Sequence, residues 1–215
     1  MANTITLSRI PVLIGVVLLL YLGGPWVRIA TVPIVLVLIL MDTLDGIVAR
    51  RRHEVGMLGS KLDIAVDRTV ELVMWVVYAH LGLVSVAIPI IFIIRGTLVD
   101  TVRSFSVVMG KTPFGMMQTR WGQRLVASGF MRTTYGIAKA VAFCLLALTL
   151  GLRGLTEVPG PWAQAVGVVA VAASWIATAV CIIRGVPVLL EARTLLRNLD
   201  PQGAQQPAKD NTPQA

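Results

Sequence analysis

Four aspartates, in two pairs at helical spacing, are the residues of this sequence best suited to do chemistry. Asp42 and Asp45 are three residues apart and Asp63 and Asp67 are four apart, so each pair projects from one face of its own helix. The basic run at residues 50–53 turns the chain between the two pairs. An antiparallel hairpin of two neighbouring helices would therefore bring the four carboxylates together.

Such a group of carboxylates needs positive charge, because acidic side chains at membrane depth cost roughly 3 kcal/mol each and also repel one another. Oxygen ligands without His or Cys favour Mg²⁺ or Mn²⁺ over Ca²⁺. Two ions that share carboxylates would suit an in-line displacement at phosphorus. The alternative is a structural charge network in which the aspartates pair with Arg50, Lys61 and Arg68.

Glycine and arginine residues lie beside these carboxylates. Gly46 directly follows Asp45, and Gly59 lies one helical turn before Asp63, so the helix surface is bare next to each carboxylate. A flat ligand could lie against that bare backbone. Arg50, one turn after Gly46, could bind a phosphate oxygen through its planar fork of donors.

The composition indicates an integral membrane protein. The 215 residues are 56% hydrophobic and only 14% charged, with a mean hydropathy of +0.79. Residues 1–190 are expected to form an all-α bundle, followed by a polar tail at residues 191–215 that begins with a short helix and is otherwise disordered. Glycine or proline separates the apolar segments, as at Gly82. Six transmembrane helices are predicted near residues 10–22, 29–49, 58–80, 83–109, 125–152 and 162–190.

The distribution of basic residues predicts the orientation. The net charge is +8, but the basic residues flank apolar segments and form no stripe with interleaved aromatics, which argues against a nucleic-acid partner. The outer loops would hold only Arg28 and Arg153, so both termini and the aspartates are expected to face the cytoplasm and anionic lipid at the cell membrane. The inner loops and termini would hold Arg9, Arg50, Arg51, Arg52, Lys111, Arg120, Arg124, Arg184, Arg193, Arg197 and Lys209.

Further basic residues lie inside the apolar segments, where a positive charge usually faces a cavity or a partner. Arg95 and Arg103 lie roughly on one helix face, and together with Arg132 they could surround a phosphorylated alcohol. The alternative is that Asp100 neutralises Arg103 and that Arg132 and Lys139 extend to the cytoplasmic boundary.

The aspartates, with the glycines, alanine and arginine between them, resemble at every fixed position the signature of the CDP-alcohol phosphatidyltransferases. The resemblance implies a homodimeric enzyme with six transmembrane helices that transfers a phosphatidyl group from a CDP-linked lipid to an alcohol and releases CMP. It also implies that Asp42, Asp45 and Asp63 are chiefly metal ligands and that Asp67, close to the same metal, is the general base. The signature as it stands here is Asp42-x2-Asp45-Gly46-x2-Ala49-Arg50-x8-Gly59-x3-Asp63-x3-Asp67, in which Gly46, Ala49, Arg50 and Gly59 would bind the CDP-lipid.

Two other short patterns are similar to phosphatidylglycerophosphate synthases and the related bacterial cardiolipin synthases, whose acceptors are glycerol 3-phosphate and phosphatidylglycerol. These patterns are Asn3-x2-Thr6-x2-Arg9 and Ile93-Ile94-Arg95 with Val102-Arg103. Gly96 replaces an acidic residue frequent in those enzymes, and residues 130–134 only partly match their Gly-Lys-x-Lys-Thr run, so inositol phosphate stays open as an acceptor. A cation transporter that uses the same aspartates is the alternative of a different class.

Overall fold

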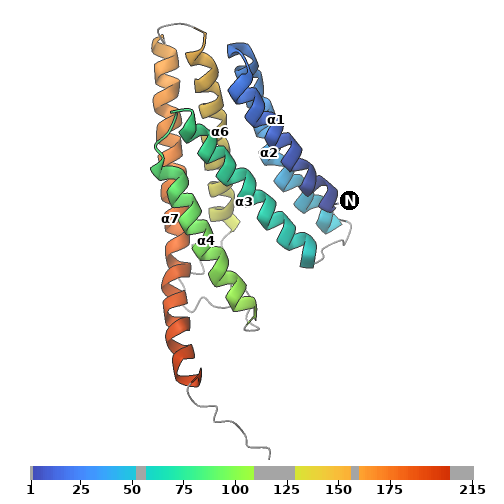
Figure 1. Cartoon of the computed structure of the whole chain (residues 1–215), viewed down its shortest axis with the longest axis vertical. Coiled ribbons are helices and arrows are strands. Elements are labelled where there is room, and N and C mark those ends of the chain that lie inside the picture. The colour runs from blue at the N-terminus through green and yellow to red at the C-terminus, as the bar shows by residue number, and fades with distance from the viewer. Residues whose placement is uncertain (1, 52–56, 109–128, 156–159, 204–215) are drawn as a thin grey trace, which may run out of the picture.

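The structure, a computed structural model, describes residues 2–51, 57–108, 129–155 and 160–203, and every regular element in these ranges is a helix (Figure 1). The predicted all-α fold is confirmed for this part of the chain. The helices are α1 (Ala2–Leu22), α2 (Pro25–Arg51), α3 (Met57–His80), α4 (Ala87–Val108), α6 (Gly129–Arg153) and α7 (Pro161–Gly203).

Proline and glycine mark where several of these helices begin and end. Pro25 and Pro161 are the first residues of α2 and α7, where the fixed φ of proline suits a helix and its missing N–H costs no hydrogen bond. After α3, Gly82 has a φ of +69°, and the N–H of Leu83 donates to the carbonyl of Tyr78 at 3.0 Å. The turn predicted at this glycine is confirmed.

Two helices are longer than the apolar runs that predict them. The first run begins near residue 10, but α1 begins at Ala2, and the last run ends near residue 190, but α7 continues to Gly203. Backbone hydrogen bonds carry a helix on through polar residues, so an apolar run gives the extent of the apolar face and not the ends of the helix. The rest of the predicted tail and the segment 109–128 lie outside the described residues.

The six helices form a closed ring. Each packs extensively against two others, in the order α1, α2, α6, α7, α4, α3 and back to α1. Figure 1 shows α6 and α7 side by side and α1 close to α2. The sequence predicts α2 and α3 as neighbours, but in the described part of the chain both pack extensively against α1, which lies between them in the ring. Helices α3 and α6 face each other across the interior.

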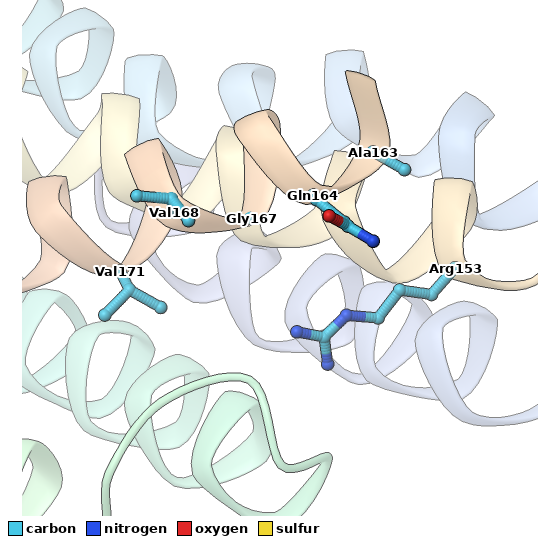
Figure 2. Close-up of a pocket in the computed structure, with 6 residues that line it drawn as sticks. All are labelled: Arg153, Ala163, Gln164, Gly167, Val168 and Val171. Atoms are coloured by element: carbon cyan, nitrogen blue, oxygen red, sulfur yellow. The ribbon is translucent and has the colours of Figure 1, made fainter. Parts of the chain in front are cut away.

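One end of the ring, where α6 ends and α7 begins, contains a groove of about 510 Å³. Figure 2 shows the polar side chains of Arg153 and Gln164 toward one end of this groove and Val168 and Val171 toward the other. The turn after α6 contacts Pro25 at the start of α2. Since α2 has 27 residues and rises about 40 Å, the groove is far from the end of α2 that carries the aspartate pair.

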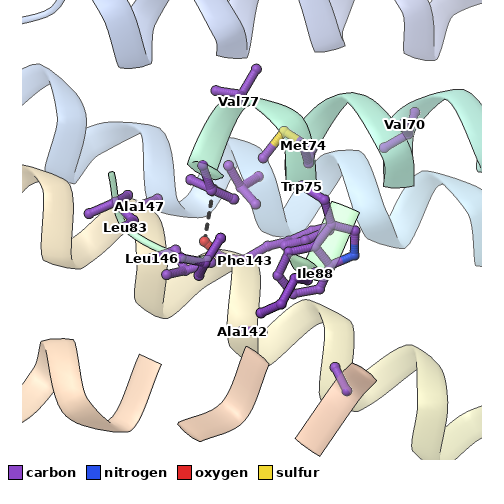
Figure 3. Packing of buried hydrophobic residues seen from close by; sticks show 14 of the residues in the cluster. Val70, Met74, Trp75, Val77, Leu83, Ile88, Ala142, Phe143, Leu146 and Ala147 are labelled. Carbon is purple, nitrogen blue, oxygen red and sulfur yellow. Dashed lines mark hydrogen bonds between the residues drawn. The ribbon is translucent and has the colours of Figure 1, made fainter. Parts of the chain in front are cut away.

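The ring interior is filled by aromatic and aliphatic side chains from α3, α4 and α6 (Figure 3). The rings of Trp75 and Phe143 meet edge to face with their centroids 4.7 Å apart, and Trp75 also lies 5.0 Å from Phe92. The hydroxyl of Tyr78 donates to the carbonyl of Phe143 at 2.9 Å. These contacts fix α3 against α6 and so determine which face of α3 points inward.

Two helical segments in the described residues, Thr133–Arg153 and Pro161–Leu190, are long and apolar enough to cross a membrane. The segments Thr6–Leu22 and Pro25–Met41 are also apolar but shorter. Large apolar side chains are exposed on the outside of the ring, for example Ile14 on α1. Membrane crossing is thus supported for α6 and α7, and the six-span bundle stays a prediction.

Candidate active site

One face of α3 leads from the surface into the interior of the ring. Asp63, Asp67, Glu71, Trp75 and Tyr78 are three or four residues apart and therefore share this face. The aspartate side chains are 43% and 39% exposed, whereas that of Glu71 is 1% exposed and the two aromatic residues are fully buried. The start of α3 thus presents carboxylates that a ligand can reach, whereas the carboxylate of Glu71 in the next turn is buried.

Among the described ion pairs, the cation that faces the two aspartates is Arg9, on α1. Its Nη1 lies 3.9 Å from Oδ1 of Asp63 and its Nη2 lies 3.6 Å from Oδ1 of Asp67. The sequence places Arg9 in the cytoplasmic N-terminal segment, but the structure places it within α1 with only 1% of its side chain exposed. Arg9 thus lies in a helix and not in a terminal segment before it, because α1 begins eight residues before the apolar run; its position on the cytoplasmic side stays a prediction.

Glu71 is the centre of a buried charge cluster that crosses the ring. Its carboxylate accepts hydrogen bonds from Nη1 of Arg68 at 2.8 Å, from Nζ of Lys139 at 3.1 Å and from the hydroxyl of Tyr135. Two of these donors come from α6, opposite α3 in the ring. The suggestion that Lys139 extends to the cytoplasmic boundary is wrong, because its ammonium is paired in the interior.

Arg68 also links the cluster to α4. Its Nε donates to Oδ2 of Asp100 at 3.1 Å. The sequence suggests Arg68 as a partner of the α3 aspartates and Asp100 as a partner of Arg103; in the structure Arg68 and Asp100 pair with each other. Arg103 is in α4, and its side chain lies outside the described residues.

Two further arginines line the same part of the interior. Arg95 of α4 is 9% exposed, and within the described residues its Nε has no hydrogen-bond partner. Its side chain passes so close to Gly185 that a Cβ there would lie 2.8 Å from Cγ of Arg95. Arg184 is 8% exposed, and its guanidinium carbon lies 5.1 Å from the ring centroid of Tyr135. The sequence places Arg184 in an inner loop, but it lies within α7.

The other predicted site residues are positioned by their helices alone. Gly59 lies in the first turn of α3 and is half-buried. Arg132 lies in α6, one turn before Tyr135, and its side chain lies outside the described residues. In the described residues Asp63 and Asp67 form a pair, and no group of three possible metal-ligating side chains is found. The last turns of α2, whose side chains are likewise outside, carry Asp42, Asp45, Gly46, Ala49 and Arg50.

The sequence interpretation missed Glu71 and Tyr135, although a signal for both exists. Glu71 continues the spacing of four that joins Asp63 to Asp67, so it belongs to the same helix face. Tyr135 lies four residues before Lys139 and therefore on the same face of α6. Helical spacing thus predicts that both residues lie on inward polar faces, but it does not predict the contact between them.

A helical bundle with carboxylates and buried cations at one end fits an enzyme that handles phosphate groups. Comparison with protein families gives the class directly, because the model for the CDP-alcohol phosphatidyltransferase domain matches residues 1–183. The chain belongs to this family, whose members transfer a substituted phosphate group from a CDP-alcohol to an acceptor alcohol in phospholipid synthesis. A comparison with curated proteins found no match. The matched region ends one residue before Arg184.

Proposed function

We propose that this chain transfers a phosphatidyl group from CDP-diacylglycerol to a phosphorylated alcohol, with glycerol 3-phosphate as the first candidate. The observation that carries the choice of acceptor is the excess of buried positive charge beside the α3 aspartates. The side chains of Arg68, Arg95 and Lys139 all lie in or beside one cluster whose described carboxylates are Glu71 and Asp100.

A buried cation is stable only when it is paired, so this excess calls for an anion. Glu71 and Asp100 engage Arg68 and Lys139, whereas Nε of Arg95 has no hydrogen-bond partner in the described residues, so Arg95 is the cation best placed for a ligand. A phosphomonoester carries roughly 1.5 to 2 negative charges at neutral pH, and arginine binds it through paired donors. Arg103 and Arg132, predicted as further acceptor ligands, lie on the same two helices as Arg95 and Lys139.

The reaction requires the acceptor hydroxyl to lose a proton as its oxygen attacks the β-phosphorus of the CDP-lipid. Asp67 is the proposed general base, since its carboxylate is partly exposed and lies one turn before Glu71, which binds the buried cations. The new P–O bond forms on the phosphatidyl group while the bond from the β-phosphorus to the bridging oxygen breaks. CMP leaves with the electron pair, and the proton passes from Asp67 to solvent.

Mg²⁺ or Mn²⁺, as two ions, is the proposed cofactor. The donor chemistry fits, because Asp63 and Asp67 offer hard oxygen ligands from one exposed face, and the end of α2, which precedes α3 in the chain, carries Asp42 and Asp45. When bound, the ions would supply positive charge to the diphosphate and the leaving CMP. Arg50 would bind a phosphate oxygen, and Gly46, Ala49 and Gly59 would let the nucleotide lie close to the backbone.

We also propose that all six helices cross the cell membrane, with both termini and the site on the cytoplasmic side. Each helix has at least 21 residues, enough for a hydrocarbon core of about 30 Å, and apolar side chains are exposed on every helix. The basic loops favour this orientation. A homodimer is expected from the family resemblance, and the mass of the purified protein in detergent tests it.

The acceptor is tested with purified protein in lipid vesicles that contain CDP-diacylglycerol and either Mg²⁺ or Mn²⁺. Glycerol 3-phosphate, phosphatidylglycerol and inositol phosphate are supplied separately, and lipid mass spectrometry identifies the product. We expect CMP release with a phosphorylated acceptor. No CMP with any acceptor would contradict the proposal, and metal flux into vesicles without CDP-lipid would favour a cation transporter.

Gly185 offers a probe of Arg95 that leaves its charge in place. Gly185→Ala would place a methyl group 2.8 Å from Cγ of Arg95, so the arginine must shift. We expect a higher KM for the acceptor with little change in the KM for CDP-lipid. Gly167→Ala on the same helix is the matched control, because its Cβ would meet Thr149 at 3.4 Å and Arg153 at 4.0 Å, which are ordinary contact distances. Equal KM values in both variants would remove Arg95 from the acceptor site.

A further inference from the structure

Arg9 is the most buried charged residue near the proposed catalytic carboxylates. Only 1% of its side chain is exposed, whereas the two carboxylates that it faces are about 40% exposed. It comes from α1, which packs directly against α3. The arginine therefore approaches the aspartates from the protein side and leaves their outer side accessible.

Arg9 faces the two aspartates with two different nitrogens of its rigid guanidinium group. Nη1 of Arg9 lies 3.9 Å from Oδ1 of Asp63, and Nη2 lies 3.6 Å from Oδ1 of Asp67. A guanidinium is planar, so the separation of its nitrogens fixes the separation of the oxygens that they attract.

Two carboxylates one turn apart on a helix repel each other and would otherwise turn outward into solvent. The buried guanidinium of Arg9, which reaches them from α1, attracts both carboxylates and so removes this tendency. Groups in contact with metal-ligating side chains commonly orient them, and their loss costs 10- to 100-fold in metal affinity. The geometry of Arg9 matches this role, because it restrains both side chains without covering their exposed surface.

We propose that Arg9 is a positioning residue that holds Asp63 and Asp67 in the orientation in which they bind a divalent cation. The inference rests on the proposed function for the presence of the cation. Arg9 itself contacts neither substrate nor metal in this scheme. Arg9 acts on the metal only through the two carboxylates. Its substitution should therefore change the affinity for the metal most directly.

The test measures Mn²⁺ binding to the purified full-length protein by calorimetry, without CDP-lipid. We expect Arg9→Gln to weaken Mn²⁺ binding about 10-fold. Arg9→Lys keeps the charge but offers one ammonium in place of two separated nitrogens, so it should restore only part of the affinity. Arg153→Gln, at an exposed arginine at the other end of α6 from the cluster, should bind Mn²⁺ like the wild type.

Thermal unfolding separates positioning from a purely structural role. Positioning predicts that Mn²⁺ raises the unfolding midpoint of Arg9→Gln less than that of the wild type. An equal rise in both, together with an unchanged dissociation constant, would overturn the inference. Tighter Mn²⁺ binding in Arg9→Gln would also overturn it, because Arg9 would then merely compete with the cation.

The outcome can be read independently of the proposed function. If the wild type binds Mn²⁺ and Arg9→Gln binds it weakly, Arg9 has the proposed role even if no acceptor yields CMP. If the wild type turns over CDP-lipid and the variants bind Mn²⁺ normally, the transferase stands and the role of Arg9 fails. A wild-type protein that binds no Mn²⁺ would also contradict the inference.

Discussion

Asp67 and Glu71 lie one turn apart on the same face of α3, yet their surroundings are opposite. The carboxylate of Asp67 is 39% exposed, and Nη2 of Arg9 lies 3.6 Å from its Oδ1. The carboxylate of Glu71 is 1% exposed and accepts hydrogen bonds from Arg68, Lys139 and the hydroxyl of Tyr135. A rise of about 6 Å along the helix separates an accessible acid from a sealed one.

This difference points to different roles for the two carboxylates. A carboxylate with three close donors is committed to holding helices together, because a ligand would have to replace strong charge-assisted bonds. A carboxylate with one longer contact and exposed surface can exchange partners during a reaction. We therefore propose that the exposed pair is the functional part of the α3 face and that Glu71 keeps α3 fixed against α6.

The largest effect is expected from breaking the sealed cluster. Glu71→Ala would remove the carboxylate from Lys139 and leave Arg68 with Asp100 alone, which should lower the free energy of unfolding by about 3 to 5 kcal/mol. Denaturant unfolding in detergent measures this change. Thr69→Ala, at an exposed position of the same helix, should change it by less than about 0.5 kcal/mol. Similar stability in the two variants would mean that Glu71 does not hold the helices.

A smaller effect is expected from removing one donor. Tyr135→Phe deletes the hydroxyl that donates to Glu71 and keeps the aromatic ring that faces Arg184. Hydrogen bonds to charged groups contribute about 1.5 to 3 kcal/mol, so the unfolding midpoint should fall by less than in Glu71→Ala. Combining both substitutions should add little to Glu71→Ala alone. Full additivity would show that the two residues act independently.

The smallest effect on the free energy of unfolding is expected from substituting Asp100, at the edge of the buried charge cluster. Asp100 and Arg68 are 31% and 19% exposed, so water screens their contact. Asp100→Asn should therefore lower the free energy of unfolding by about 1 kcal/mol or less. A loss as large as that of Glu71→Ala would place the centre of the network at Asp100 and would move the boundary between the sealed and accessible regions toward α4.

Much of the fold follows from the sequence, because apolar runs and their proline and glycine boundaries are local properties. The helices around Gly82 and the start of α7 at Pro161 lie close to the predicted places. The start of α1 at Ala2 does not, since polar residues continue that helix. The order of the helices in the ring could not be predicted from the sequence either, because it depends on which helix faces pack against one another. The sequence therefore gives no reason to expect α1 between α2 and α3.

The site was predictable to the extent that it depends on register. The spacing of Asp63 and Asp67 places both on one face, and the structure has them there. Arg9, the partner of these residues in the described part of the chain, comes from another helix, so spacing alone could not identify it. Arg9 reaches the aspartates only because α1 packs on α3, and Lys139 reaches Glu71 only because α6 lies across the ring.

The central claim is that the exposed acid of α3 does chemistry and the buried acid one turn later does not. It is tested most directly by the turnover per folded molecule of Asp67→Asn and Glu71→Gln, measured as CMP released from CDP-diacylglycerol with saturating acceptor. We expect Asp67→Asn to lose at least about 10²-fold with an unchanged unfolding midpoint, and Glu71→Gln to lose stability but keep most of its turnover. Wild-type turnover in Asp67→Asn would contradict the account.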